Sequence, residues 1–393
     1  MSSNKVYVIG YGLTKFGELY NQGSSSLAAQ ALTDAITNSQ ADKNQIQTAF
    51  FGSLVSSTNS QPSIGASCIR NCNLNIPITR IEAGNASGAA AFYQAYLSIL
   101  SGVYNCTAVV GVEKLSDYVQ SGVIERILGS TIDYQWEFEM GATLTSLYAI
   151  LTKEHMKKFG TTLEQLASVP AKNHKNGVHN PQAQFRREIK IENFLKAKRI
   201  SDPIGRFDPA TYCDGAAALI LASSKYIEDN SNISTQVPIL GSGQASDSLA
   251  LHHRDSLTTI SSSIKAADVA FSEAKLSPKD INFAEVHDSY PIGEILAIED
   301  LGFFSKGEGG KATQEGLTEL NAKISVNPSG GLKSRGDPFG ATGVAQIAEV
   351  VEQMKGNAGQ RQVSENNYGL TQNVIGTGVM SYINIFGKDE VKK

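Results

Sequence analysis

The sequence contains few cysteines and no long apolar segment, and both features limit what the protein is. Four cysteines in 393 residues are too few for a disulfide scaffold, and no histidine lies near Cys68 and Cys72 to complete a zinc site. We therefore expect buried free thiols and no metal. No apolar run approaches the roughly 20 residues of a transmembrane helix. The first residues lack the apolar core of a secretion signal, so we expect a cytoplasmic protein without a membrane span.

Positive charge is not in excess either. The net charge of −4 argues against a general nucleic-acid-binding protein. The exception is the segment from Lys153 to Arg199, where eleven Lys or Arg residues stand against four acids. Its breaker residues, as in "NHKNGVHNPQAQFRREI", predict a loop. The segment is either a solvated basic face or the rim of a pocket for a phosphate-bearing ligand, which Lys and Arg bind through charge-assisted hydrogen bonds.

At 393 residues the chain is longer than one hydrophobic core usually fills, so we expect two packed units. Strand and helix patterns alternate along the first half, which is typical of an α/β protein. We expect, in order, a strand in 5–12, an amphipathic helix over Ser26–Ser39, a strand in 46–55, a helix ending at Leu100, and strands in 106–115 and from Asp214.

A second cycle resembles the first. Residues 35–52 and 270–287 both run from a helix end through a polar link to an isoleucine and a strand, at a constant offset. In each half a glycine-rich turn then leads to an alanine-containing helix, in Gly84–Leu100 and in Gly330–Met354. The repeat predicts two stacked α/β halves that face each other across a cleft.

The turn in the first half has the sequence "GNASG", residues 84–88. The free N–H groups at a helix start favour negative charge, and the apex of such a turn is where an activated nucleophile usually stands. Here the apex residue is Asn85, and an amide is not a useful nucleophile. Asn85 therefore either takes a left-handed turn position or caps the helix, or it marks an altered active site.

Polar residues also gather in a loop of the second half. In "AEVHDSYPIGEIL" a strand is expected to end at Val286 and to present His287, Asp288, Ser289 and Tyr290. Ligands of α/β proteins bind at the carboxyl ends of strands. This loop is therefore either part of a site or an exposed turn that happens to contain a histidine.

Two further loops follow. In "NPSGGLKSRGDPFGATGVAQIAEVVEQM" Asp337 lies before a helix expected over Ala345–Met354. Asp337 either caps this turn or, if it is buried in an apolar cleft, has a raised pKa and acts as a general base. In "NVIGTGVMSYINIF", an expected strand-turn-strand, the N–H groups of Gly376 and Gly378 are candidates to stabilise an oxyanion.

These motifs together resemble the thiolase superfamily, and within it the sterol-carrier-protein type and archaeal acetyl-CoA acetyltransferase branch. The resemblance spans the chain, because "VIGYGLTKFG", "EAGNASGAAA", "VVGVEKL", "NHKNGVHNP", "DGAAALILAS", "EVHDSYPIGEI", "EDLGF", "NPSGGLKSRGDPFGATG" and "GNAGQRQV" fall in the family's order. It implies a duplicated thiolase fold of two α/β/α/β/α halves in five layers with an inserted loop domain. The domains it implies are an N-terminal half (1–118 and 206–238), a basic loop domain (119–205) and a C-terminal half (239–393).

The resemblance also implies a ligand and partners. The loop domain is expected to bind coenzyme A, with Arg186, Arg187, Ser242 and Gly243 as contacts. A CoA thioester is then the substrate or ligand, and no covalently bound cofactor is expected. Proteins of this branch form dimers or dimers of dimers, and often pair with a small zinc-ribbon OB-fold protein. We therefore expect a homodimer or tetramer and a partner of that kind.

The catalytic positions depart from the family pattern. Thiolases that condense or cleave acyl-CoA have a nucleophilic cysteine at the position matching Asn85 and a histidine at the position matching Asp337. Many have a second cysteine at the position of Ser289, and only His287 is kept here. A thiolate attacks the thioester and the missing histidine deprotonates it, so the resemblance implies no cysteine-dependent thiolysis or condensation.

Three hypotheses follow. The first is a lyase without a covalent intermediate, an aldolase or decarboxylase of CoA thioesters, in which His287 and the glycine N–H groups hold the thioester oxygen and Asp337 or Tyr290 moves a proton. The second is a catalytically silent subunit that binds acyl-CoA within a thiolase-type complex. The third is an acyl-CoA acyltransferase that acts by another route.

Overall fold

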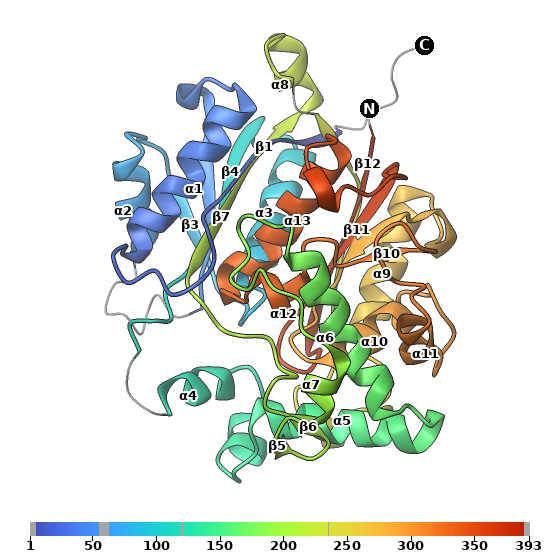
Figure 1. Cartoon of the computed structure of the whole chain (residues 1–393). Coiled ribbons are helices and arrows are strands. Elements are labelled where there is room, and N and C mark those ends of the chain that lie inside the picture. Colours follow the sequence, from blue (N-terminus) through green and yellow to red (C-terminus); the bar gives the residue numbers. More distant parts are fainter. Residues whose placement is uncertain (1–4, 55–62, 119–121, 235, 389–393) are drawn as a thin grey trace.

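The computed structural model describes residues 5–54, 63–118, 122–234 and 236–388. At their centre lies a mixed sheet of ten strands in the order β10-β9-β11-β12-β8-β1-β7-β4-β2-β3, surrounded by helices (Figure 1). The first half contributes β1 (Val6–Leu13), β2 (Thr48–Gly52), β3 (Ile78–Ile81), β4 (Cys106–Glu113) and β7 (Gly215–Ser223). The second half contributes β8 (Val237–Ser246), β9 (Phe283–Glu285), β10 (Ser325–Val326), β11 (Tyr368–Val374) and β12 (Met380–Gly387).

The two halves of the sheet have the same internal order. Outward from the antiparallel β1–β8 junction, each half places its first strand innermost, followed by its fifth, fourth, second and third. The 3₁₀ turns η1 (Lys43–Gln45) and η4 (Pro278–Asp280) lie 235 residues apart, and so do the starts of β2 and β9. This constant offset confirms the duplicated fold that the sequence predicts.

Helices α1 (Ser24–Ser39) and α9 (Ser261–Ala274) are the equivalent outer helices of the two halves. Helix α1 packs on β1 and β7, and α9 packs on β8 and β12. The buried face of each helix is rich in alanine. Such small side chains let a helix lie close to the sheet, which explains why both segments have an alanine-rich apolar stripe.

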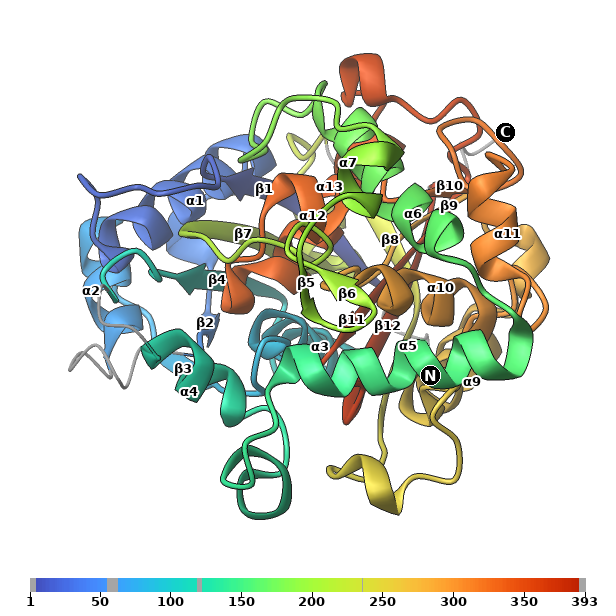
Figure 2. The same ribbon diagram turned by 60° about the horizontal axis from the view of Figure 1, so that its bottom comes forward.

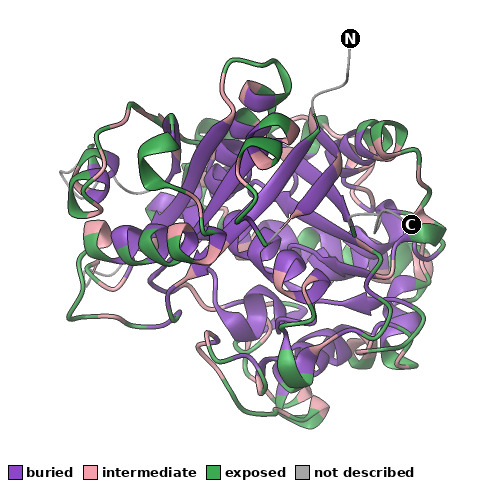
Figure 3. Ribbon diagram, turned by 90° about the horizontal axis from the view of Figure 1, so that it is seen from above, coloured by how far each residue is buried: buried purple, intermediate pink, exposed green. Residues whose placement is uncertain are grey.

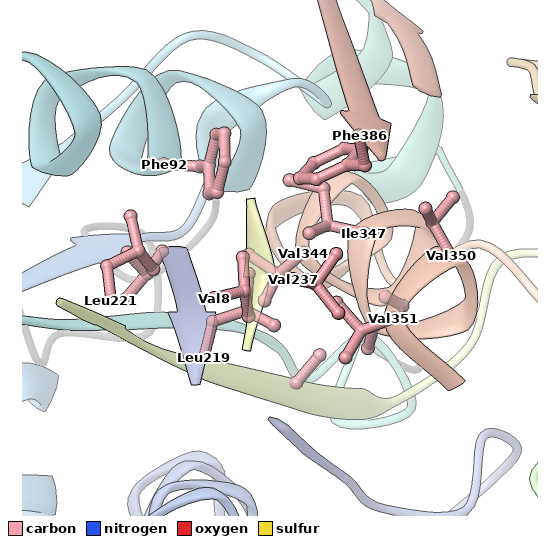
Figure 4. Packing of buried hydrophobic residues seen from close by; sticks show 14 of the residues in the cluster. Val8, Phe92, Leu219, Leu221, Val237, Val344, Ile347, Val350, Val351 and Phe386 are labelled. Carbon is pink, nitrogen blue, oxygen red and sulfur yellow. The ribbon is translucent and has the colours of Figure 1, made fainter. Parts of the chain in front are cut away.

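Helices α3 (Ser87–Leu100) and α13 (Thr342–Met354) lie in the middle of the molecule (Figure 1), where most of the ribbon is coloured as buried in Figure 3, although α3 keeps an exposed face at Leu97 and Leu100. Side chains from both helices and from β1, β7 and β12 make one apolar cluster (Figure 4). Within it the rings of Phe92 and Phe386 lie 6.1 Å apart. Burial of a side chain of this size stabilises a fold by about 1.5–3 kcal/mol, so this cluster holds the two halves together.

The turn before α13 docks on the start of α3 by close backbone contact. A Cβ atom on Gly88 or Gly111 would lie only 2.2 or 2.3 Å from the carbonyl oxygen of Gly340, so only glycine fits at both positions. The N–H of Gly340 also donates to the carboxylate of Glu113 at 3.1 Å. These contacts fix the two glycine-rich turns against each other.

The segment between β4 and β7, coloured from teal to yellow-green, covers the lower half of Figure 1 as far as the centre of the molecule and comes forward in Figure 2. Its elements are α4 (Val123–Gly129), the π-helical turn η2 (Tyr134–Phe138), α5 (Leu144–Phe159), α6 (Leu163–Gly177), α7 (Ile191–Leu195), β5 (Arg199–Ser201) and β6 (Ile204–Gly205). The expected start of this domain, residue 119, lies outside the described residues, and the domain boundaries stay a prediction.

The loop expected at "NHKNG" is wrong, because Asn173–Gly177 is the end of α6. All of these residues except the exposed Lys175 are buried, and Asn173 and Asn176 are bonded to the second half of the chain. The Nδ2 of Asn173 donates to Asp288 at 2.6 Å, and the Nδ2 of Asn176 donates to the carbonyl of Asn327 at 3.0 Å. These tertiary bonds outweigh the low helix propensity of Asn and Gly.

Other element bounds differ from the expected ones by up to three residues. Helix α1 begins at Ser24, α13 begins at Thr342, and β9 ends at Glu285. The remaining elements are α2 (Ile64–Asn71), α8 (Ser224–Asp229), η3 (Leu251–His253), α10 (Pro291–Asp300), α11 (Gly309–Gln314), α12 (Gly331–Arg335), η5 (Phe339–Ala341) and η6 (Gly359–Arg361). The four cysteines are free thiols, three of them buried and Cys72 half-buried. None of the helices in the described ranges is long and apolar enough to cross a bilayer.

Candidate functional site

Three turns meet at one buried point, and each follows the carboxyl end of a strand. Asn85 follows β3, His287 follows β9 and Gly376 follows β11. The Nδ2 atom of Asn85 lies 3.2 Å from Nε2 of His287, and the N–H of Gly376 donates to Oδ1 of Asn85 at 3.0 Å. Carboxyl ends of strands are where α/β proteins bind their ligands.

Both ring nitrogens of His287 face side-chain amide nitrogens. Because Oδ1 of Asn85 accepts from Gly376, its Nδ2 is oriented toward Nε2 of the imidazole. The Nδ2 of Asn373 lies 3.1 Å from Nδ1 and also donates to Oε1 of Gln346 at 2.9 Å. A neutral imidazole has one acceptor nitrogen, so only one of the two amides donates to it. Burial, with the nearby positive charge of Arg335, lowers the pKa of His287 to about 3. His287 is therefore a neutral imidazole at physiological pH.

A row of tyrosines extends from this point. The hydroxyl of Tyr148 donates to the carbonyl of Gly376 at 2.8 Å, and its ring stacks on Tyr290 at a centroid distance of 4.2 Å. The hydroxyl of Tyr290 lies 2.7 Å from that of Thr145 and is hydrogen-bonded to Tyr212. Burial raises the pKa of all three phenols. They stay protonated and can donate hydrogen bonds.

Asp337 lies at the other end of the tyrosine row. Its backbone N–H donates to the carbonyl of Thr211 at 3.1 Å, which places Asp337 next to Tyr212. Its Oδ1 atom accepts from the hydroxyl of Thr342 at 2.6 Å. Only 1% of the residue is exposed, and burial raises the pKa of the carboxyl to about 6. Asp337 is thus ionised at pH 7 yet basic enough to take up a proton, as a general base requires.

A cavity of about 930 Å³ adjoins this end of the row, and Tyr212 and Cys213 line its wall. Basic side chains contribute to the wall from three segments, at Arg187, Arg206 and Lys333. Apolar rings and two acids, Glu18 and Glu188, are also part of it. The mixture of apolar surface and positive charge suits a long ligand that carries both apolar and anionic parts.

Most of the site residues expected from the sequence are brought together. Those in the buried row are Asn85, His287, Ser289, Tyr290, Asp337 and Gly376. Ser289 makes the weakest contact, with its hydroxyl 3.5 Å from that of Tyr148. The N–H of Gly378, by contrast, donates to the carbonyl of Ile375 at 2.8 Å within its own turn. It is therefore not free to bind an oxyanion.

The expected CoA contacts do not lie together. Arg187 lines the cavity, whereas Arg186 is exposed and bonds the carbonyl of Val178 at 3.3 Å. Ser242 and Gly243 belong to β8, a central strand. There Ser242 bonds Asn384 at 2.6 Å, and neither residue lines the cavity. The register of the sheet, which the sequence does not reveal, places them in the core.

Sequence reasoning missed Tyr148, Tyr212, Asn373 and Lys333. They come from α5, the segment before β7, β11 and α12, far apart in the chain. The only local signal is weak, because each is a polar side chain in an apolar or glycine-rich stretch. Only the fold brings them to one place.

Two family models match nearly the whole chain. The first, Thiolase, N-terminal domain, covers residues 6–225, and the second, Thiolase C-terminal domain-like, covers residues 243–388. The chain belongs to the thiolase family. Among curated proteins it is similar to an acetyl-CoA acetyltransferase of Methanothermobacter thermautotrophicus, at 40% identity over 98% of this chain and 99% of that protein. It is also similar to sterol carrier protein 2 of Bos taurus, at 30% identity over 96% of this chain and 71% of that protein.

Solved structures confirm the fold of this member of the thiolase family. An Ltp2-ChsH2(DUF35) aldolase superposes with a TM-score of 0.86 at 21% identity over 98% of both chains. Human mitochondrial 3-ketoacyl-CoA thiolase in complex with CoA superposes with a TM-score of 0.75 at 15% identity, also over 98% of both. The protein is therefore a thiolase-like, acyl-CoA-related protein with the fold and branch expected from its sequence.

Proposed function

We propose that this protein is a lyase that cleaves or forms a carbon–carbon bond next to a CoA thioester without a covalent intermediate. The observation that carries the proposal is the buried Asp337 carboxyl, with a pKa of about 6, at the end of a row of tyrosines in which Tyr212 lines the large cavity. A base of this kind near neutral pH matches the demands of proton transfer.

The proposed substrate is a 3-hydroxyacyl-CoA ester. The Asp337 carboxylate takes the proton of the 3-hydroxyl group, and C3 becomes a carbonyl carbon. The bond between C2 and C3 breaks, and its electron pair stays on C2. The resulting enolate of the shortened thioester receives the same proton back on C2 from Asp337. Phenols of Tyr212 and Tyr290 donate hydrogen bonds to the enolate oxygen while it carries charge.

The absence of a covalent step follows from how Asn85 is bonded. Its oxygen takes the N–H of Gly376 and its nitrogen bonds His287. An amide is not a useful nucleophile toward a thioester, and both ends of this one are already bonded. Cys213, the thiol that lines the cavity, is no substitute, because burial raises its pKa well above the ordinary value and thiolates, not thiols, attack thioesters.

The cavity is the proposed site of the CoA portion. Arg187 and Arg206 supply positive charge for its phosphates, and the apolar wall suits the pantetheine chain. Support also comes from the similar fold of the human mitochondrial thiolase that was solved with CoA.

Decarboxylation is the second candidate, because loss of CO₂ from a malonyl-type thioester needs no nucleophilic cysteine. It needs only hydrogen-bond donors for the enolate oxygen, which the phenols supply. It requires no base, and a malonyl-type substrate would bring a second carboxylate toward the buried Asp337 carboxylate. Like charges at short range in a buried site are unfavourable. We therefore expect cleavage of 3-hydroxyacyl esters to be faster than decarboxylation of malonyl-CoA.

The test is turnover of a panel of 3-hydroxyacyl-CoA esters and malonyl-CoA by the wild type, Asp337→Asn and the exposed control Asp202→Asn, with acetyl-CoA binding measured by calorimetry. The proposal expects cleavage by the wild type and by the Asp202→Asn control only, and binding by all three. Binding without turnover of any ester would favour a silent acyl-CoA-binding subunit. A protein thioester that hydroxylamine removes would favour an acyltransferase.

For the assembly we propose a homodimer that pairs through β3. This strand is at one end of the ten-stranded sheet, so its outer edge has no neighbour among the described strands. Beside it Phe50, Leu97 and Leu100 line an open surface hollow. Exposed strand edges next to apolar surface are suited to pairing with a second copy. Light scattering of the wild type and of Leu97→Asp tests this, with a monomeric variant expected.

A zinc-ribbon OB-fold protein stays the proposed partner. The support is the sequence resemblance together with the fold similarity to the Ltp2-ChsH2(DUF35) aldolase. Co-purification of the chain with such a protein from its own organism is the direct check.

A further inference from the structure

One lysine of the cavity has an unusual environment. Lys333 belongs to α12, whose first N–H groups are held by the carboxylate of Asp288, at 2.7 Å from Leu332 and 3.2 Å from Lys333 itself. The side chain runs to the cavity wall, and only 6% of the residue is exposed. Its Nζ atom donates to the carbonyl of Pro209 at 2.7 Å.

No carboxylate of the described residues lies within ion-pair distance of this amine. Asp208 and Asp288 act on it only from farther away, and their charges favour the ammonium form. Burial outweighs them and lowers the pKa of Lys333 to about 8. The other charged or titratable groups at this wall include Arg187, Arg206 and His174, and burial lowers the pKa of that histidine to about 4, so it is neutral.

The amine therefore combines two properties of a reactive lysine. A substantial fraction of it is unprotonated near neutral pH, about two orders of magnitude more than for a lysine of ordinary pKa. It also faces a cavity large enough for a thioester ligand. A desolvated lysine in an apolar pocket is a nucleophile toward carbonyl carbon.

We propose that Lys333 is a site of self-acylation by the CoA thioester bound in this cavity. The Nζ lone pair attacks the thioester carbonyl carbon, the C–S bond breaks, and the proton released by nitrogen leaves with the sulfur as free CoA thiol. The product is a stable amide on Lys333. The proposal rests on the binding of CoA thioesters in the cavity, but not on lyase turnover.

Acylation changes the cavity in two ways. It removes the positive charge of the amine, and it adds an acyl group at the wall beside Tyr212 and Pro209. Both changes oppose rebinding of a CoA ester. The modified protein is therefore expected to bind acetyl-CoA less tightly, which would make Lys333 a regulatory position.

The experiment is incubation of the purified wild type with isotopically labelled acetyl-CoA between pH 6.5 and 9.5, followed by peptide mass spectrometry. The internal controls are Lys175 and Lys311, whose side chains are 56% and 64% exposed. Lys333 should be labelled about tenfold faster than either, because its free-amine fraction is larger although its intrinsic nucleophilicity is lower. The rate should rise with pH and level off above about 8.

Three further arms make the result decisive. Excess desulfo-CoA should suppress labelling at Lys333 and leave Lys311 unchanged, because only the first reaction passes through the cavity. The label should resist hydroxylamine, unlike a thioester. The Lys333→Arg variant should lose the label at position 333 and keep that of Lys311. If this variant does not fold, the labelled positions found in the wild type by peptide mass spectrometry still decide whether Lys333 is acylated.

Labelling of Lys333 no faster than of Lys175 and Lys311, or labelling that desulfo-CoA does not suppress, would overturn the proposal. If calorimetry shows acetyl-CoA binding in the same samples, the acyl-CoA function stands and only the acylation fails. If acetyl-CoA does not bind at all, both fail together.

Discussion

The two glycine-rich turns occupy equivalent places in the duplicated fold, one before α3 and one before α13, and they carry opposite chemistry. Asn85 in the first turn has both ends of its amide bonded, to Gly376 and to His287. Asp337 in the second turn keeps a buried carboxyl whose pKa is about 6. A neutral amide with both ends bonded holds the geometry of its turn, whereas a carboxyl of this pKa is suited to accept a proton near neutral pH.

Under the proposed function, the first half of the duplicated fold is a scaffold and the second half holds the reactive group. Close backbone contact through Gly88 and Gly111 holds the two turns in register. The tyrosine row then links them, from Tyr148 at the Asn85 end to Tyr212 at the Asp337 end. Changes in the second turn should therefore affect rate, and changes in the first should affect stability.

The largest expected effect is on the reactive side of this comparison. Asp337→Asn should lower the turnover of a 3-hydroxyacyl-CoA ester by about 10²–10⁴-fold, since a positioned base contributes that much. Acetyl-CoA binding should change little. For the wild type, kcat/KM should rise with pH through about 6, where the carboxyl ionises. A variant that keeps full activity would show that Asp337 is not the base.

The contact between the two turns is expected to be nearly as sensitive, but in stability. Gly88→Ala places a Cβ 2.2 Å from the carbonyl oxygen of Gly340, which the packed core cannot accommodate. We expect a loss of about 3 kcal/mol in the free energy of unfolding, or no folded protein. Gly23→Ala is the matched control, because a Cβ there meets nothing within 4 Å. Chemical denaturation compares the two, and equal midpoints would contradict the close contact.

The tyrosine row should give an intermediate effect on rate. Tyr290→Phe removes the hydroxyl that bonds Thr145 and Tyr212 but leaves the ring stack on Tyr148. We expect kcat to fall by about 10–100-fold with little change in KM, as for the loss of one oxyanion donor. The exposed Tyr134→Phe serves as the control. An unchanged kcat would remove the phenol from the mechanism.

Asp337→Asn should also stabilise the protein at neutral pH. Burial raises the folded-state pKa from the ordinary 3.8 to about 6. The unfolded chain therefore loses its proton first as pH rises, and stability falls between pH 4 and 6. Above pH 6 this costs about 2–3 kcal/mol. Thermal melts should show the variant more stable than the wild type at pH 7.5 and equal to it below pH 4, and a constant difference would contradict the buried carboxylate.

The scaffold side should respond least in rate. Asn85→Ala leaves the N–H of Gly376 and the Nε2 of His287 without partners, which costs about 1–3 kcal/mol of stability. Turnover should fall less than in Asp337→Asn. The surface variant Asn44→Ala is the control for a generic loss of an amide. If Asn85→Ala abolishes turnover at full stability, Asn85 takes part in the chemistry itself.

The sequence predicted the fold well because its signals are local or repeated. The offset between the two halves, the GNASG turn and the strand end before His287 are all short-range patterns. It also predicted a raised pKa for Asp337 on condition of burial, and the fold supplies that burial, whereas its role as a general base stays a prediction.

What the sequence could not predict depends on long-range packing. Tyr148 and Tyr212 join the site from distant elements, and no local pattern marks them. Ser242 and Gly243 were expected at the ligand but belong to a central strand. The order of strands in a sheet cannot be predicted from the spacing of residues along the chain. The end of α6 is helical against its own propensity because Asn173 and Asn176 bond the other half.

The most direct test of the central claim uses no knowledge of the natural substrate. Propionyl-CoA in D₂O should exchange its C2 protons when the wild type is present, because the proposed base transfers a proton at that carbon in both directions. The exchange should rise with pH through about 6 and disappear in Asp337→Asn, while both proteins bind propionyl-CoA. Absence of exchange in a wild type that binds the ester, or equal exchange by Asp337→Asn, would contradict the account.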